Sequence, residues 1–118
     1  GERFRLLLAQ YPPNTPTAVH SHEGWVVIGI IEGSERYTSW QRIDDGSDPA
    51  HADLVVVQDH HIMPGEFGYL YNEPFNVHRQ AAEAHGAVEL VLMKGRGRRL
   101  NHIDEATGEC SEPIDLNR

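Results

Sequence analysis

Short apolar runs separated by turn residues repeat along almost the whole chain. They occupy residues 4–9, 26–31, 52–58, 67–71 and 87–93. Runs of this length that are rich in β-branched residues predict buried strands. Several short strands at a spacing of about ten residues predict an all-β fold, either a sandwich or a barrel.

Turn signals lie between these runs. The three prolines in residues 11–16 cannot donate to a β-ladder and predict a loop. Residues 32–35 (EGSE) predict a hairpin turn that joins the strand 26–31 to a returning strand at 36–43, where polar and apolar positions alternate. Residues 44–49 predict a second turn.

The second half of the chain follows the same pattern. Residues 77–80 predict the beginning of a further strand, and only residues 80–84 show a trace of helical periodicity. The tail 101–118 is polar and irregular, with a hairpin expected around Thr107-Gly108. We therefore expect a single domain, residues 1–118, with a core at about 4–100 and an irregular tail at 101–118.

The composition predicts the cellular environment of the protein and excludes some classes of partner. An apolar content of 39% and a charged content of 24% are typical of a soluble globular protein. There is no apolar run of about 18 residues and no signal-peptide layout at the N-terminus, so we expect neither a transmembrane helix nor secretion. The single cysteine, Cys110, favours a reducing cytoplasm. The net charge of -8 argues against a nucleic-acid-binding surface.

A pair of histidines stands before the strand at 26–31. Residues i and i+2 of an extended chain point to the same face, so His20 and His22 direct their imidazoles to one point. Two neutral imidazoles on one face can begin a transition-metal site. The alternative is two ordinary polar residues at a strand end, because a His-x-His pair by itself is a weak signal.

Histidine is frequent in the chain as a whole, and the residues are spread out instead of forming a tag. They are His20, His22, His51, His60, His61, His78, His85 and His102. A folded site can gather some of them. We expect the histidines at 51, 60, 61, 85 and 102 to lie mostly at the surface.

A second unit of sequence brings a third imidazole. Pro64-Gly65-Glu66, a short strand and a proline-containing turn precede His78. Together with the histidine pair, this order of motifs resembles the cupin superfamily. Residues 20–33 (HSHEGWVVIGIIEG) are similar to its cysteine-dioxygenase-like branch, the thiol dioxygenases, and residues 77–79 resemble the third-ligand strand of that branch. The resemblance covers residues 6–93 and implies a double-stranded β-helix, a small jelly-roll barrel with a metal at its centre.

The resemblance implies a metal held by His20, His22 and His78. The usual cupin also has a carboxylate ligand four or five residues after its second histidine, where this chain has Val26 and Val27. The implied site is therefore a three-histidine site, as in the thiol dioxygenases. Three neutral ligands on one side of the ion leave positions for O2 and a chelating substrate, which suits Fe(II). The same ligands also suit Zn(II) or Ni(II).

The chain departs from the thiol dioxygenases elsewhere. Val91 and Met93 stand where the histidine and tyrosine of that branch's proton relay are expected. Arg3 and Arg5 are poor substitutes for its substrate-binding arginine, and Val27 stands at the position of its crosslinked cysteine. The ligand set is therefore carried over, whereas cysteine oxidation is not.

Two further residues are candidates for catalysis. If the strand parity holds, Glu89 faces the pocket together with Val91 and Met93, where a carboxyl group can act as acid or base. Gln80 lies two residues after His78 on the same face and can hydrogen-bond a substrate or a metal-bound water. Glu23 should turn away from the metal, and aromatic residues such as Tyr37 should pack.

We expect a metallocupin that most closely fits an Fe(II)-dependent dioxygenase acting on O2 and a small metal-chelating organic substrate. One alternative is a Zn or Ni cupin with Lewis-acid hydrolase, isomerase or lyase chemistry. A second alternative is a non-catalytic module that senses a ligand or a metal, because one fold hosts many functions. Because an open β-edge has to be covered, we also expect a homodimer.

Overall fold

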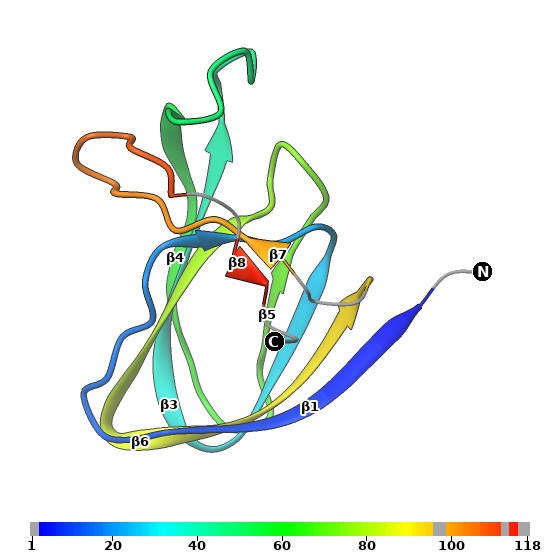
Figure 1. Cartoon of the computed structure of the whole chain (residues 1–118). Coiled ribbons are helices and arrows are strands. Elements are labelled where there is room, and N and C mark those ends of the chain that lie inside the picture. The colour runs from blue at the N-terminus through cyan, green and yellow to red at the C-terminus, as the bar shows by residue number, and fades with distance from the viewer. Residues whose placement is uncertain (1–2, 96–98, 112–113, 116–118) are drawn as a thin grey trace.

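A computed structural model describes residues 3–95, 99–111 and 114–115, and within them every regular element is a β-strand (Figure 1). The strands are β1 (Phe4–Tyr11), β2 (His20–Ser21), β3 (Val26–Arg42), β4 (Leu54–Ile62), β5 (Phe67–Leu70), β6 (Val77–Lys94), β7 (Arg99–Leu100) and β8 (Ile114–Asp115). The predicted all-β architecture is confirmed. No helix in the described ranges has the length and apolar character needed to cross a membrane.

The two long strands β3 and β6 form the centre of the fold. They pair antiparallel over almost their whole lengths, so that the first half of each strand lies beside the second half of the other. Register shifts interrupt the ladder between Ile30 and Glu35, and bulges of this kind bend a strand. The long strands therefore curve over on themselves and enclose an interior, as Figure 1 shows.

The remaining strands extend each half of this central pair. β1 pairs with the second half of β6 and β5 with the first half of β3, which gives one four-stranded layer. β2 pairs with the first half of β6 and β4 with the second half of β3, which gives the other. This arrangement matters for function because it brings β2 directly beside the beginning of β6.

Two local predictions are wrong. Residues 32–35 do not form a hairpin turn, because β3 continues through them and pairs with β6 on both sides, from Glu32 with Val88 to Glu35 with Ala82. Residues 80–84 are not helical but belong to β6, which also joins the predicted strands 77–80 and 87–93. Glycine and serine suit a bulge as well as a turn, and only the partner strand decides between them.

The core consists of two apolar clusters. The larger one contains Val26, Ile28, Ile30, Tyr37, Ile62, Leu70, Val91 and Met93. The smaller one contains Val19, Trp40, Ala52, Val77 and Ile103. Ile103 comes from the predicted irregular tail, where His102 also forms a β-bridge with His20. The expected hairpin at Thr107-Gly108 is present, since the Gly108 N–H donates to Asp104 O at 2.7 Å.

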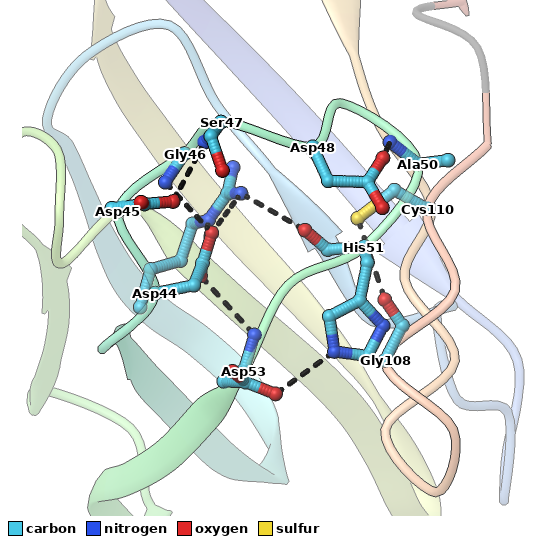
Figure 2. Close-up of polar contacts among 11 residues, drawn as sticks. Asp44, Asp45, Gly46, Ser47, Asp48, Ala50, His51, Asp53, Gly108 and Cys110 are labelled. Carbon is cyan, nitrogen blue, oxygen red and sulfur yellow. Dashed lines mark hydrogen bonds and ion pairs between the residues drawn. The ribbon is translucent and has the colours of Figure 1, made fainter.

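The loop between β3 and β4 is rich in aspartate and lies against the segment that carries Cys110 (Figure 2). Arg42 pairs with Asp44 at 2.9 Å, and His51 pairs with Asp53 at 2.9 Å. Asp45 and Asp48 accept backbone N–H groups two residues ahead of them. These carboxylates bind groups of the loop and its flanking residues. The aspartates therefore stabilise the loop at this end of the sheet.

The bend in β3 leads to a prediction about stability. Gly33 has φ +74°, and an added Cβ would overlap the carbonyl oxygen of Gly86. Gly46 has nearly the same φ, +75°, but no atom lies within 4 Å of its added Cβ. Gly46→Ala should lower the free energy of unfolding by about 1–2 kcal/mol through backbone strain alone. Gly33→Ala should cost about 1–3 kcal/mol more through overpacking. Urea unfolding of both variants tests this, and equal losses would contradict the tight contact at the bend.

Candidate metal centre

Three imidazoles from distant parts of the sequence meet inside the fold. Pairing of β2 with β6 sets His20 opposite His78, and His22 follows just after β2. The Nε2 atom of His22 lies 3.1 Å from that of His20 and 2.9 Å from that of His78. The Nε2 atoms of His20 and His78 are 3.0 Å apart. His20, His22 and His78 are the one such group of potential metal ligands found in the described ranges.

The other ring nitrogens determine which Nε2 atoms are unprotonated. His20 Nδ1 lies 2.7 Å from Ala18 O, which can only accept, so His20 Nδ1 carries the proton. Tyr37 donates its hydroxyl proton to Tyr69 O at 3.1 Å and therefore accepts from His78 Nδ1 at 2.9 Å. Both Nε2 atoms thus present bare lone pairs to a common point. Such lone pairs repel each other at this distance, and a cation between them removes the repulsion.

The three imidazoles are held in the neutral form that binds metals. Burial is the largest cause in each case: it lowers the pKa of His22 to about 3 and the pKa of His20 below its ordinary value. It also lowers the pKa of His78 well below the ordinary value, and His78 is only 1% exposed. The site therefore binds a cation without first releasing protons from its ligands.

The spacing of the nitrogens carries information about coordination. Ligand nitrogens about 2.1 Å from a metal lie about 3.0 Å apart at right angles and about 3.4 Å apart at tetrahedral angles. The observed separations of 2.9 to 3.1 Å match right angles. Such a triangle occupies one face of an octahedron and suits metals that take further ligands on the opposite side.

The nitrogens face a cavity of about 190 Å³ with mostly apolar walls. Its lining includes Leu7, Ala9, Tyr11, Thr17, Val26, Ile28, Gln80, Glu89, Val91 and Met93. As the strand parity predicts, Glu89, Val91 and Met93 all face inward. Apolar walls keep bulk water away from the metal-binding nitrogens and strengthen polar interactions inside the cavity.

Polar groups gather at one part of this cavity. The side-chain amide of Gln80 donates to both carboxylate oxygens of Glu89 at 2.9 Å and lies 3.4 Å from Glu35 Oε1. Burial raises the pKa of Glu89 to about 9, and the charge of Glu35 and a hydrogen bond to Glu35 add to the shift. Burial also raises the pKa of Glu35. The two carboxyl groups thus share a proton inside the protein.

Sequence reasoning missed two residues here, Tyr37 and Glu35. Tyr37 was expected only to pack, yet its hydroxyl orients His78. Glu35 was assigned to a turn, yet it is fully buried beside Glu89. No local signal identifies either of them, because their roles follow from how the two long strands pair. The bulges between Ile30 and Glu35 also interrupt the alternation of inward-facing and outward-facing residues in β3. The sequence alone therefore cannot tell whether Glu35 and Tyr37 face the interior.

Other candidate residues lie away from the nitrogens or cannot bind a metal. Val26 is buried beside the cavity and Val27 is on the opposite face of β3, so neither adds a ligand. Glu23 is exposed. His51 pairs with Asp53, and His61 pairs with Glu83 at 2.8 Å.

Known structures with this arrangement of strands include cupins of several activities. A sugar phosphate isomerase of the cupin superfamily from Silicibacter pomeroyi is 14% identical with a TM-score of 0.57, and the match covers 98% of this chain and 69% of that one. An acetylacetone dioxygenase from Acinetobacter johnsonii is 13% identical with a TM-score of 0.56, over 98% of this chain and 63% of that one. The recombinant pro-11S globulin of pumpkin is 16% identical with a TM-score of 0.63, over 85% of this chain.

These matches establish the fold and nothing finer. The chain spans 23% of the pumpkin globulin and 44% of an oxalate oxidase with a TM-score of 0.62. No protein-family model and no curated protein sequence matches the chain. The protein therefore has the jelly-roll fold of the cupins, with a cluster of three histidines in its interior.

The hydrogen bond between Tyr37 and His78 leads to a prediction about metal affinity. Tyr37→Phe leaves His78 Nδ1–H without its acceptor and frees the ring to change tautomer. We expect an affinity for divalent metal about 10–100-fold lower, measured by competition with a chelator. Tyr71→Phe is the matched control, since Tyr71 is 59% exposed and should leave the affinity unchanged. Equal affinities of Tyr37→Phe and the unaltered protein would show that Tyr37 only packs.

The buried imidazoles also predict how the metal-free protein responds to acid. In the unfolded chain His22 takes up a proton near pH 6.5, whereas its pKa of about 3 keeps it neutral in the native protein down to about that pH. The free energy of unfolding should therefore fall as the pH drops from about 6.5 towards 3. His22→Gln should make this fall less steep in urea titrations between neutral and acidic pH. His85→Gln, a change at an exposed histidine, should leave the slope as it is, and a slope that neither change alters would contradict the assignment.

Proposed function

We propose that the protein is an Fe(II)-dependent dioxygenase that acts on a small, metal-chelating organic substrate, with His20, His22 and His78 as the ligands. The observation that carries the proposal is the triangle of neutral nitrogens, 2.9 to 3.1 Å on each side, at the wall of a small apolar cavity. Three neutral ligands in this arrangement suit a facial site with room for O2 and a chelator. The similarity of residues 20–33 to the thiol dioxygenases supports the same assignment.

Iron(II) at this place would supply the redox chemistry of dioxygenation, which amino-acid side chains cannot supply by themselves. The protein contributes the surroundings. Val91, Met93 and the other apolar walls exclude water from the reacting groups. Right angles between the ligands at the metal fit a tetrahedral zinc site less well, which is why we place Zn(II) behind iron. Ni(II) accepts the same angles and remains an alternative ion for this site.

Glu89 and Gln80 are the residues to which we assign roles towards the substrate. Both line the cavity that holds the histidines, and both are at most 5% exposed. With its pKa raised to about 9, Glu89 keeps a proton at neutral pH and can exchange it with a bound substrate. Gln80 holds the Glu89 carboxyl group in position through two hydrogen bonds at 2.9 Å.

Metal analysis of protein purified without added metal tests the proposal. We expect iron in the unaltered protein and loss of the metal in His20→Ala, His22→Ala and His78→Ala, with His85→Ala as a control that keeps it. Oxygen consumption should then appear with at least one chelator from a panel of thiols, 1,3-diketones and 2-hydroxy acids. Glu89→Gln should retain the metal but slow oxygen consumption by about 10²-fold or more. Bound zinc with no oxygen uptake would favour Lewis-acid chemistry, and full metal in all three histidine variants would refute the ligand set.

We also propose that the protein works as a homodimer in a reducing cytoplasm, as its single cysteine favours. The outer face of the sheet is unusually apolar at the edge strand β1, where Leu6 and Leu8 are 67% and 69% exposed. They lie across from Leu92 and Leu90 of β6, which are also exposed. Exposed apolar patches of this kind mark interaction sites in soluble proteins.

A mass measurement in solution tests the homodimer. We expect twice the chain mass at micromolar concentration, and a single chain mass for Leu6→Glu, which places a charge in the centre of the apolar face. Val56→Glu, on the exposed surface of β4, is the control that should remain dimeric. An unaltered protein that runs as a monomer at this concentration would contradict the homodimer.

A further inference from the structure

A buried pair of carboxyl groups and one amide form the polar part of the cavity and its immediate surroundings. Glu89 and Gln80 come from β6 and Glu35 from β3, and their exposed fractions are 0%, 5% and 0%. They lie next to walls formed by residues such as Leu7 and Val91. Whatever fills the cavity therefore meets Glu89, whose carboxyl group is coupled to that of Glu35, in surroundings with little water.

Gln80 and Thr17, two of the donors at this end, already have partners in the protein. The amide N–H groups of Gln80 are directed at the Glu89 and Glu35 carboxyl groups. The Thr17 hydroxyl donates to Ala18 O at 3.1 Å and accepts from the Gln80 backbone N–H at 3.1 Å. A hydrogen bond also links the carboxyl groups of Glu89 and Glu35. A ligand group that needs to accept hydrogen bonds thus finds few free donors at this end.

The charges around the cavity also disfavour a ligand group that is negatively charged. The part of the lining that the structure describes contains no lysine or arginine. The two carboxyl groups also act on Tyr11, whose pKa is raised to about 12, first by burial and then by the charges of Glu89 and Glu35. In addition, Glu35 Oε2 is buried with no hydrogen-bond partner. A second negative charge here would be desolvated, unpaired and repelled, whereas a donor or a cation would be stabilised.

We propose that the site selects chelating substrates that carry a hydrogen-bond donor or a protonated amine on the side facing Glu89, and that it rejects those with a carboxylate there. This inference rests on the proposed function, because it takes the chelating atoms to be held at the histidines. It separates the protein from enzymes whose substrates are anchored through a carboxylate by an arginine.

Ligands with one chelating head and different side chains test the proposal. Catechols with an aminoethyl, a hydroxyethyl or a carboxymethyl side chain share a rigid head, so the side chain cannot reach the same metal ion. Binding to the cobalt(II)-loaded protein without oxygen is followed by the visible absorption of the metal, which needs no turnover. We expect the aminoethyl compound to bind at least about tenfold more tightly than the carboxymethyl compound, with the hydroxyethyl compound between them.

A variant then assigns the preference to the carboxyl pair. Glu89→Gln keeps the shape of the side chain and removes one carboxyl group of the pair, so the preference should shrink to less than about threefold or reverse. Glu66→Gln is the matched control, because Glu66 is exposed and lies on another face of the sheet. It should keep the preference of the unaltered protein.

The outcomes separate this inference from the proposed function. Equal binding of the three catechols, or tighter binding of the carboxymethyl compound, would overturn the inference while leaving the metal site intact. A preference that survives in Glu89→Gln would equally overturn it. Failure to bind cobalt, or to bind any of the three compounds, would overturn the proposed function and this inference with it. The comparison in the unaltered protein does not depend on whether a variant folds.

Discussion

The structure depends on bringing the Nε2 atoms of three imidazoles to within about 3 Å of one another, and those of His20 and His78 carry no proton. Uncharged lone pairs at that distance repel, so the rest of the fold has to hold the rings in place. Pairing of β2 with β6 positions His20 and His78, and the acceptors Ala18 O and Tyr37 Oη fix the tautomers of these two rings. A cation bound between these nitrogens would remove the repulsion, which links the fold to the proposed function.

The cavity beside these nitrogens has two contrasting parts. Apolar side chains form most of its walls, and a buried group of Gln80, Glu89 and Glu35 forms the rest. The apolar part raises the energetic cost of any unpaired charge, so the acidic part has more influence on what can bind. Under the proposed function, the choice of substrate depends on its hydrogen-bond donors more than on its size.

Some elements were predictable because their signals are local. The apolar run at 26–31 and the alternation at 36–43 identified strands, and the spacing of His20 and His22 placed two imidazoles on one face. The bend at Gly33 was mistaken for a hairpin turn. A glycine with positive φ fits both structures, and the difference lies in whether β6 pairs on both sides of it. The two halves of β6 were likewise predicted as separate strands, because only pairing with β3 shows that the strand continues between them.

By itself, the sequence determined the strand-forming segments, the lack of a carboxylate ligand after the histidine pair and the inward face of Glu89. These features follow from residue type and from the two-residue period of a strand. Tertiary structure alone decided that His78 reaches the pair, that Tyr37 orients it and that Glu35 meets Glu89. Each of these contacts joins residues far apart in the chain, and their distance depends on the register and bulges of β3 against β6, which no local pattern of residues encodes.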